Sequence, residues 1–334
     1  MDVAKSEANQ EAARSYRADA RKLAQAGDHR GAAASYALAA DAAPDSDARL
    51  FQAIQLKQAG DVDEAEKVYQ CFLAANPESY DGWSSYAVMM KRAKQFAKAV
   101  EAFQSALAIR DDTDARNGLV TSLWHLGHHD AARKEGLINL HRKDRLAFER
   151  FEASPSNGYA LSDRRPEFDP WKRTRNIISF SLWGDNPIYV TGAIVNAQIA
   201  RHIYVGWTPR FYCDTSVPED ARTELKRLGA QVILLTDPEL QKIRPMWRFL
   251  VSDDDDVDYF VCRDTDSRLN VQEFLAVHAW TQSGKRFHVM RDHIFHMELI
   301  LAGMWGGVAG VLPNLRDWLL SAPDYFNNKF GDQA

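Results

Sequence analysis

Residues 259–268 read YFVCRDTDSR, a short apolar segment that ends in Asp-x-Asp with an arginine on each side. In an extended chain, residues i and i+2 point to the same side, so Asp264 and Asp266 are expected to face one point at the carboxyl end of a strand. Two convergent carboxylates suit a hard divalent cation such as Mg²⁺ or Mn²⁺. A cation held there could in turn hold a diphosphate. The stretch therefore predicts a buried strand that leads into a metal-dependent binding site.

The sequence around this motif alternates between expected strands and helices. Strands are expected at 177–182, 210–213, 232–235, 259–262 and 287–290, and helices at 187–203, 218–228 and about 271–283. This alternation predicts a mostly parallel sheet in an α/β domain. Ligands of such sheets bind at the carboxyl ends of the strands, where the loops 183–186 and 264–268 would lie.

The first half of the chain is predicted to be a helical repeat array. Two series of alanines and one series of aromatic residues recur every 33 or 34 residues, namely Ala20, Ala53 and Ala87; Ala32, Ala65, Ala99 and Ala132; and Tyr36, Tyr69 and Phe103. This pattern resembles the tetratricopeptide repeat, with units at 13–46, 46–79 and 80–113 and a degenerate fourth unit at about 113–146. Small residues let paired helices approach closely, and about three repeats make such a stack stable. The array is expected either to bind a peptide or partner protein or to form a homodimer.

The two halves are joined by a segment of different composition. Residues 147–170 mix proline, serine, glycine and charged residues and lose the repeat period. This composition predicts a linker, or a segment that packs over the next domain. The expected domains are the repeat array at 1–146 and an α/β domain at 171–334.

Bulk composition narrows the classes of function. The net charge of −5 argues against a general nucleic-acid-binding protein, which would carry a basic surface. The three cysteines give neither a disulfide framework nor Cys-x-x-Cys metal spacing. The polar start lacks the apolar core of a signal peptide, and no stretch reaches the roughly 18 apolar residues of a membrane span. A cytoplasmic protein with no membrane span and no nucleic-acid partner is expected.

The second half resembles a family of bacterial glycosyltransferase-like proteins that have a GT-A-type fold and are often found with polysaccharide or capsule genes. The resemblance covers about residues 175–310 and lies in the blocks SFSLWGDNPIYVTGAIVNA, YVGWTPRFYCD, MWRFL, RDTDSR, FHVMRDH and LAGMWGG. It implies a GT-A-like, Rossmann-like α/β domain that takes a nucleotide-sugar donor, usually a UDP-sugar. It also implies Mn²⁺ or Mg²⁺ at the Asp-x-Asp motif and a glycan or protein acceptor.

The resemblance assigns roles by position. Asp264 would contact the ribose or the metal, and Asp266 would ligate the metal. Ser179, Ser181 and Trp183, on the first strand and its exit, would lie near the base.

The arginines that flank the motif have two possible roles. Arg263 and Arg268 could neutralise the two acids and lower their pKa values. The planar fork of arginine also suits diphosphate oxygens, and Arg268 is the candidate for that contact. The nearby acidic run at 253–256 is expected to be a solvated loop.

Residues 288–296, HVMRDHIFH, supply the candidates for catalysis. Asp292 and His293 are expected to line the acceptor or metal side of the cleft, with Asp292 as a candidate base in an inverting route. The alternative is a buried hydrogen-bonded cluster. His293 and His296 could share a helical face and a zinc ion, although a third clear ligand is missing. Arg291 is a candidate anion contact.

Two features near the end of the sequence complete the candidates. Trp305 could stack on a sugar face or simply seal the core. The family pattern continues beyond a Gly-x-Asp-Gln-like block, whereas here the sequence ends just after it at Ala334. Whether a carboxyl-terminal tail supplies an acid, base or metal ligand is therefore open.

Two functions from different classes follow from these features. The first is a metal-dependent glycosyltransferase with a repeat module for a partner, an acceptor or a second copy. The second is a non-catalytic scaffold or adaptor whose α/β domain binds a nucleotide or glycan without turnover. Inverting and retaining routes both remain open, as do the sugar and the acceptor.

Overall fold

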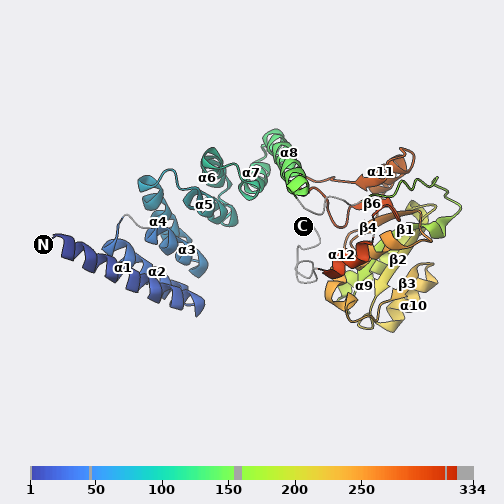
Figure 1. Ribbon diagram of the computed structural model, residues 1–334, viewed down its shortest axis with the longest axis horizontal. Helices are drawn as coiled ribbons and strands as arrows, with labels where there is room; N and C mark the ends of the chain where they lie inside the picture. Colours follow the sequence, from blue (N-terminus) through green and yellow to red (C-terminus); the bar gives the residue numbers. More distant parts are fainter. Residues whose placement is uncertain (1, 45–46, 154–159, 313, 322–334) are drawn as a thin grey trace. The chain divides into compact units, whose positions relative to one another are not determined.

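The computed structural model describes residues 2–44, 47–153, 160–312 and 314–321, and the chain falls into two compact units (Figure 1). The first unit comprises Met1–Arg145 and the second comprises Leu146–Ala334. None of the described helices is both long and apolar enough to cross a membrane. The carboxyl-terminal block at 330–334 lies outside the described residues.

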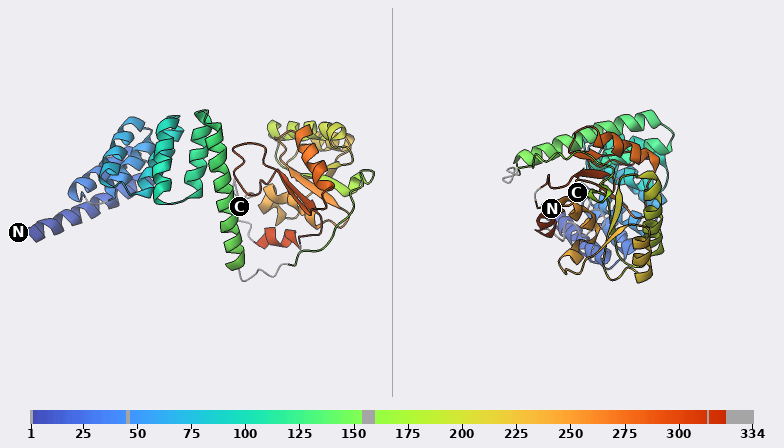
Figure 2. Two further views of the ribbon diagram at one scale, coloured as in Figure 1. Left: turned by 90° about the horizontal axis from the view of Figure 1, so that it is seen from above. Right: turned by 90° about the vertical axis from the view of Figure 1, so that its right-hand side faces the viewer.

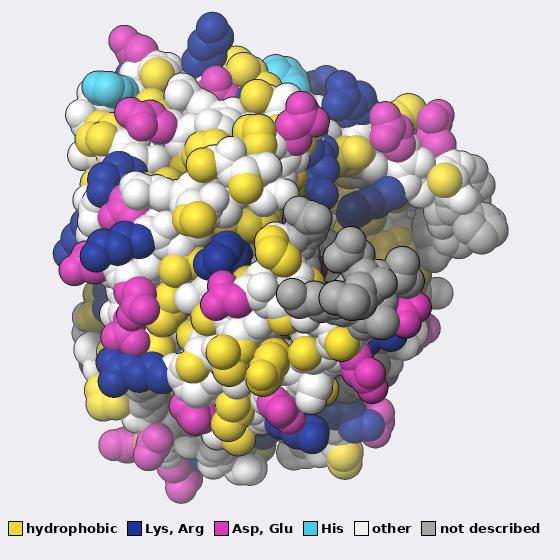
Figure 3. Space-filling model, turned by 90° about the vertical axis from the view of Figure 1, so that its left-hand side faces the viewer, with side chains coloured by type: hydrophobic (Ala, Val, Ile, Leu, Met, Phe, Trp, Pro, Cys, Tyr) yellow, Lys and Arg dark blue, Asp and Glu magenta, His cyan; other side chains and the backbone are white. Residues whose placement is uncertain are grey.

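The first unit is a series of helix pairs (Figures 1 and 2). Its helices are α1 (Asp2–Gln25), α2 (His29–Ala42), α3 (Ala48–Ala59), α4 (Val62–Ala75), α5 (Tyr80–Arg92), α6 (Phe96–Ile109), α7 (Thr113–His125) and α8 (His129–Ala153). All seven alanines of the two repeat series have 0% of their surface exposed, so neighbouring helices meet at these small side chains. Gly60 ends α3 with a left-handed φ of 85°, which favours glycine. The predicted helical array is confirmed. On the face shown in Figure 3, basic, acidic and hydrophobic side chains are interspersed.

The segment between the predicted domains is not a simple linker. Helix α8 runs to Ala153, inside the range 147–170. Residues 160–170 pack onto the α/β unit, where Arg164 pairs with Asp258 at 2.7 Å and the Tyr259 hydroxyl donates to the Pro166 carbonyl at 2.8 Å. For residues 160–170, the structure therefore agrees with the second expectation, a segment packed over the next domain.

The second unit is an α/β fold around a sheet of order β3-β2-β1-β4-β6-β5. The strands are β1 (Asn176–Leu182), β2 (Thr208–Cys213), β3 (Gln231–Leu234), β4 (Tyr259–Arg263), β5 (Phe287–Val289) and β6 (Trp305–Val308). The first four are parallel as predicted, whereas β6 runs antiparallel to both β4 and β5. The sequence did not predict β6, because its Gly306 and Gly307 have low strand propensity. Gly306 is needed there, since a Cβ would lie 2.4 Å from the Phe260 carbonyl oxygen.

Helical segments cover both faces of this sheet (Figures 1 and 2). Helices α9 (Pro187–Ile203), α10 (Glu219–Arg227) and α11 (Val271–Thr281) pack on one face, and the 3₁₀ segment η2 (Leu240–Asp253) and α12 (Leu315–Ser321) pack on the other. A short 3₁₀ turn, η1 (Arg173–Arg175), precedes β1. All of β1 is buried, and its neighbours Ile177 and Ile178 belong to the cores of opposite faces because side chains alternate along a strand.

The acidic run at 253–256 has structural roles that its composition does not reveal. Asp253 accepts hydrogen bonds from the backbone nitrogens of Leu315 and Arg316 at 3.0 and 2.7 Å, at the start of α12. Asp254 pairs with the buried Arg210 at 2.6 Å. The expectation of a merely solvated loop is therefore wrong for the first two of these acids.

We expect the stability of the protein to fall by about 2 kcal/mol between pH 6.5 and 4 because of His288. Burial, helped by the charge of Arg263, lowers the pKa of His288 from 6.5 to about 4. Between pH 6.5 and about 4, the imidazole is therefore protonated in the unfolded chain and neutral in the folded chain. Lowering the pH through this range stabilises the unfolded state relative to the folded state. The magnitude is reduced from the full shift because the imidazole is only partly buried.

The measurement is the urea-unfolding free energy at several pH values for the wild type and for His288→Gln. Carboxylates also titrate in this range, so the difference between the two proteins isolates His288. Equal slopes for the two proteins between pH 6.5 and 4 would contradict the prediction.

Candidate functional site

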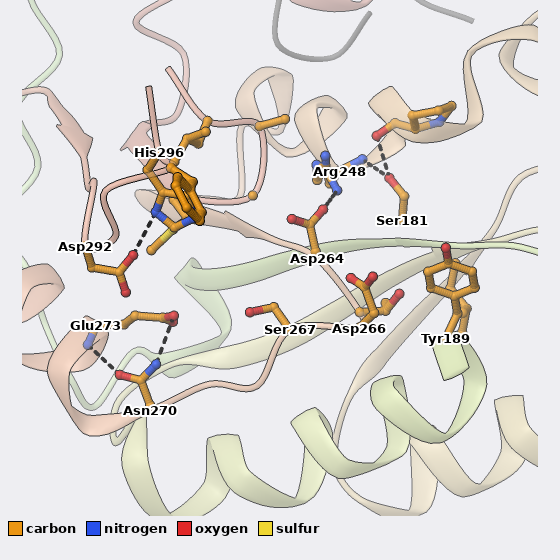
Figure 4. Close-up of a pocket in the computed structure, with 18 of the residues that line it drawn as sticks. Ser181, Tyr189, Arg248, Asp264, Asp266, Ser267, Asn270, Glu273, Asp292 and His296 are labelled. Carbon is orange, nitrogen blue, oxygen red and sulfur yellow. Dashed lines mark hydrogen bonds and ion pairs between the residues drawn. The ribbon is translucent and has the colours of Figure 1, made fainter. Parts of the chain in front are cut away.

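A pocket of about 700 Å³ opens at the carboxyl ends of β1 and β4 (Figure 4). Its lining includes the side chains of Ser181, Trp183, Arg248, Asp264, Asp266, Glu273, Asp292 and His296. They come from the exit of β1, from η2, from the loop after β4, from α11 and from the segment before β6. The pocket therefore lies at the sheet edge where the sequence predicted a ligand.

The Asp-x-Asp motif lies inside this pocket. Figure 4 shows the carboxyl groups of Asp264 and Asp266 pointing into it from the loop that follows β4. Asp264 is 45% exposed, and its Oδ1 accepts a hydrogen bond from the guanidinium of Arg248 at 2.6 Å. Its Oδ2 lies against Gly303, where a Cβ would come within 2.0 Å of it. Asp264 is thus held between an arginine on one side and bare backbone on the other.

Helix α9 fixes the loop that carries the two acids. Asn196, which has no exposed surface, donates from its amide nitrogen to the carbonyls of Thr265 and Ser267 at 3.3 and 2.7 Å. Its Oδ1 accepts the backbone N–H of Leu269 at 3.1 Å. Gly192 lets the helix approach, since a Cβ there would lie 2.0 Å from the Thr265 oxygen. The loop conformation is therefore set by tertiary contacts with α9.

Two serines of β1 hold the segment that delivers Arg248. Ser179 is fully buried and donates from its Oγ to the Arg248 carbonyl at 2.6 Å. The Ser181 Oγ accepts the backbone N–H of Arg248 at 2.9 Å and donates to the Pro245 carbonyl at 3.1 Å. Ser181 and Trp183 line the pocket, whereas Ser179 does not. Both serines position η2 beside the motif.

Arg263 is used for the core of the domain, not for the two acids. Its side chain is 2% exposed and pairs with Glu273, itself 4% exposed, at 3.1 Å. Asn270 donates to the other oxygen of Glu273 at 3.0 Å (Figure 4). Burial raises the pKa of Glu273, and the neighbouring positive charge of Arg263 opposes that rise. The expectation that Arg263 neutralises the motif is wrong, and the arginine on Asp264 is Arg248.

The candidates for catalysis are arranged differently from the prediction. Segment 290–301 contains no helix, so His293 and His296 do not share a helical face. Asp292 and His296 line the pocket and form an ion pair at 2.8 Å when the imidazole is protonated (Figure 4). His293 does not line the pocket, and its Nδ1 accepts the backbone N–H of Phe295 at 3.2 Å. The histidine beside Asp292 is therefore His296.

Three other candidates lie outside the pocket lining. Arg268 donates to the Thr265 carbonyl at 3.1 Å, and Arg291 donates to the carbonyls of Glu298 and Leu299. Both guanidinium groups thus support backbone turns in this structure. The Trp305 ring packs edge-on against Phe249 and Phe260 at 5.4 and 5.2 Å between centroids, which matches the expectation that it seals the core.

The oxygen donors suit a hard divalent cation that takes further ligands from its substrate. No group of three or more His, Cys, Asp or Glu side chains in the described ranges is arranged to hold a metal, so no zinc site forms there at His293 and His296. Magnesium, however, is commonly bound by one or two carboxylates together with water and substrate phosphates. Asp264 and Asp266 fit that pattern, because both carboxyl groups face the open pocket.

If the pocket binds a divalent cation through Asp264, Gly303→Ala should reduce the affinity for Mn²⁺ about 10-fold or more while changing the melting temperature little. A Cβ at this position would lie 2.0 Å from Asp264 Oδ2, so the partly exposed carboxyl must turn away from its present place. A misplaced ligand of this kind costs one to two orders of magnitude in affinity. Calorimetric titration and thermal unfolding of the full chain check both parts. Unchanged binding by the folded variant would show that the position of Asp264 is not critical.

The likenesses to known proteins described here are distant. No protein-family model matches the chain, and no curated protein is significantly similar to it. Among solved structures, a MamA protein has a TM-score of 0.39 at 17% identity over 43% of this chain and 79% of its own. MamA 41-end from Desulfovibrio magneticus RS-1 has a TM-score of 0.36 at 17% identity over 42% and 78%. A Thermobaculum terrenum O-GlcNAc transferase mutant has a TM-score of 0.33 at 15% identity, over 79% of this chain and 46% of its own.

Proposed function

We propose that the α/β unit is a metal-dependent glycosyltransferase of GT-A type that uses a nucleotide-sugar donor, with UDP as the nucleotide. The observation that carries this proposal is the pair Asp264 and Asp266, which project from the end of a central parallel strand into a pocket of about 700 Å³. That volume suits a ligand of nucleotide-sugar size. The buried cation Arg248 beside the pair adds a group that favours an anionic ligand.

The side chains of the pocket would have separate roles in such a transfer. Mn²⁺ or Mg²⁺, when bound, would supply positive charge to the departing diphosphate. Asp264 and Asp266 would hold that ion. In an inverting route, the acceptor oxygen bonds to the anomeric carbon, the bond from that carbon to the diphosphate oxygen breaks, and the Asp292 carboxylate takes the hydroxyl proton. His296, 2.8 Å from Asp292, would orient that carboxylate.

Calorimetric titration of the full chain with UDP, GDP and their sugars, with and without Mn²⁺, tests the proposal. We expect UDP to bind tightly only with metal, GDP to bind more weakly, and a UDP-sugar to be turned over when an acceptor is added. Asp255→Asn is a matched control, because it removes an exposed acid of the run at 253–256 that does not line the pocket. Absence of nucleotide binding in every combination would overturn the proposal and favour the scaffold or adaptor.

We also propose that the helical array is the binding module, and that its partner carries acidic groups. Lys57 and Lys91 occupy equivalent positions 34 residues apart, near the ends of α3 and α5. Burial, with the charge of Arg92 added, lowers the pKa of both lysines. Within the described ranges, none of these three cations has an acidic partner within ion-pair distance. A carboxylate ligand would relieve this repulsion.

We expect the full chain to bind a fluorescent polyglutamate peptide, and the double variant Lys57→Glu/Lys91→Glu to bind it at least about 10-fold more weakly. The matched control is Lys22→Glu/Lys134→Glu, which changes the same charge at exposed positions of α1 and α8. Fluorescence anisotropy at low and high salt measures the affinity. Equal binding by both double variants would contradict a specific acidic site and leave self-association as the role of the array.

A further inference from the structure

Arg248 is the only arginine or lysine among the described residues that line the pocket. Its side chain is 6% exposed, and its guanidinium lies 2.6 Å from Asp264 Oδ1. Ser179 and Ser181 hold the backbone of this residue through both its carbonyl and its N–H, independently of Asp264. The fold itself therefore builds a cation into the wall of the pocket.

The positive charge of Arg248 opposes the binding of a metal ion to Asp264. Oδ1 of Asp264 faces the guanidinium and Oδ2 lies against the Gly303 backbone, so a divalent ion at Asp264 would lie close to a positive charge. Two positive charges beside the same carboxylate repel each other strongly, and the repulsion is stronger where the surroundings exclude water. Metal binding to the ligand-free pocket is therefore opposed by Arg248 in two ways, by repulsion and by competition for Oδ1.

A diphosphate would remove both obstacles. Its negative charge offsets the repulsion, and its oxygens match the guanidinium fork at least as well as one carboxylate oxygen does. If the guanidinium moves from Asp264 to the phosphate oxygens, Asp264 becomes free to bind the metal. Metal and diphosphate then each make the pocket better for the other, and the coupling must be reciprocal.

We propose that Arg248 is the diphosphate-binding residue of this pocket and that it couples the binding of nucleotide to the binding of metal. The inference rests on the proposed function, because it takes a nucleoside diphosphate and a divalent cation as the ligands. In this proposal the diphosphate contact lies on η2 and not at Arg268, the residue expected from the sequence. In the ligand-free protein Arg248 engages Asp264, and in the complex it engages the phosphates.

The test compares wild type with Arg248→Gln in calorimetric titrations of the full chain with Mn²⁺ alone, UDP alone, UDP with Mn²⁺, and uridine. For the wild type, we expect Mn²⁺ to raise the UDP affinity by about 5–150-fold. For Arg248→Gln, we expect Mn²⁺ alone to bind about 5-fold or more tightly than to wild type, and the coupling factor to fall toward one. UDP affinity with metal should fall, whereas any affinity for uridine, which lacks phosphate, should not change.

One further variant separates the charge of Arg248 from the shape of its guanidinium, and a second variant is a control. Arg248→Lys keeps the positive charge and removes the fork, so it should bind Mn²⁺ as the wild type does and bind UDP more weakly. Arg244→Gln is the matched control, because this arginine lies on the same segment, pairs with Asp214 at 3.1 Å and does not line the pocket. It should behave as wild type in every titration. Circular dichroism confirms that each variant is folded.

The outcomes distinguish this inference from the proposed function. Unchanged or weaker Mn²⁺ binding by folded Arg248→Gln overturns the inference, whatever the nucleotides do. So does a gain in Mn²⁺ affinity in Arg248→Lys equal to that in Arg248→Gln, because charge would then not be the cause. If the wild type binds no nucleotide with metal, the proposed function fails, and the assignment of Arg248 to a diphosphate fails with it. Tighter Mn²⁺ binding by Arg248→Gln would then still establish the competition at Asp264.

Discussion

Replacing Asp266 by alanine is expected to lower metal-dependent sugar transfer by about 10³-fold and leave the melting temperature unchanged. Asp266 is exposed, and within the described ranges its carboxyl group has no hydrogen-bond or ion-pair partner, so its removal leaves no buried group unsatisfied. Surface changes of this kind alter the free energy of unfolding by less than about 0.5 kcal/mol. The measurement is the release of UDP with added acceptor and Mn²⁺, together with a thermal melt.

Two matched variants decide what the loss means. Asp266→Asn keeps the shape of the side chain and removes its charge, and we expect it to be nearly as inactive because a neutral amide binds a hard cation poorly. Asp255→Asn makes the same chemical change at an exposed acid outside the pocket and should retain full activity. A folded Asp266→Ala protein with wild-type turnover would remove the basis for assigning a metal to this motif.

The sequence predicted the elements whose signals are local. Apolar runs alternating with helical segments placed β1 to β4 and α9 within a residue or two, because period and length are read from neighbouring residues. The same alternation put Asp264 at the carboxyl end of a strand, where the pocket lies. What followed from chain order and strand geometry could be predicted without knowing any tertiary contact.

The arginine on Asp264 could not be predicted in this way. Arg248 lies in η2, 16 residues before its partner Asp264. This segment contains a non-helical Ile243 and an internal proline, so it has no regular period. Its place depends on hydrogen bonds to Ser179 and Ser181, almost 70 residues earlier in the chain. Arg263, adjacent to the motif, was the natural choice from spacing alone. The fold instead directs it into the core toward Glu273.

The histidine of the pocket is His296 and not the predicted His293, because the segment that carries them does not form the helix that the prediction considered. The i, i+3 spacing of His293 and His296 has meaning only on a helix, and the segment that carries them has no helix. The chain turns so that Asp292 meets His296 and leaves His293 outside the pocket. A polar segment with many possible hydrogen bonds gives no period from which such a turn could be derived.

We expect Glu273→Ala to lower the unfolding free energy of the α/β unit by about 3–5 kcal/mol, a large part of the stability of an ordinary domain. The carboxylate of Glu273 is the acidic partner of the buried Arg263, and alanine would leave that guanidinium charged in surroundings that exclude water. Burial lowers the pKa of Arg263, but Tyr204 and Glu273 together raise it by more. An arginine side chain also does not lose its proton in proteins, so deprotonation cannot relieve the unpaired charge. Urea unfolding followed by tryptophan fluorescence measures the loss, with Trp280 on the same helix as a reporter.

Two controls show that burial, not the ion pair as such, is responsible. Glu224 and Arg227 also form an arginine–glutamate pair, at 2.6 Å on α10, but there the Arg227 side chain is 69% exposed. Glu224→Ala should therefore cost less than about 0.5 kcal/mol, because water solvates the remaining charge. Replacing both buried partners, as Arg263→Met with Glu273→Leu, should restore most of the loss, since no charge is then left unpaired. If Glu273→Ala cost no more than Glu224→Ala, the guanidinium of Arg263 would have to reach water or another acid, and the core around β4 would be looser than its contacts indicate.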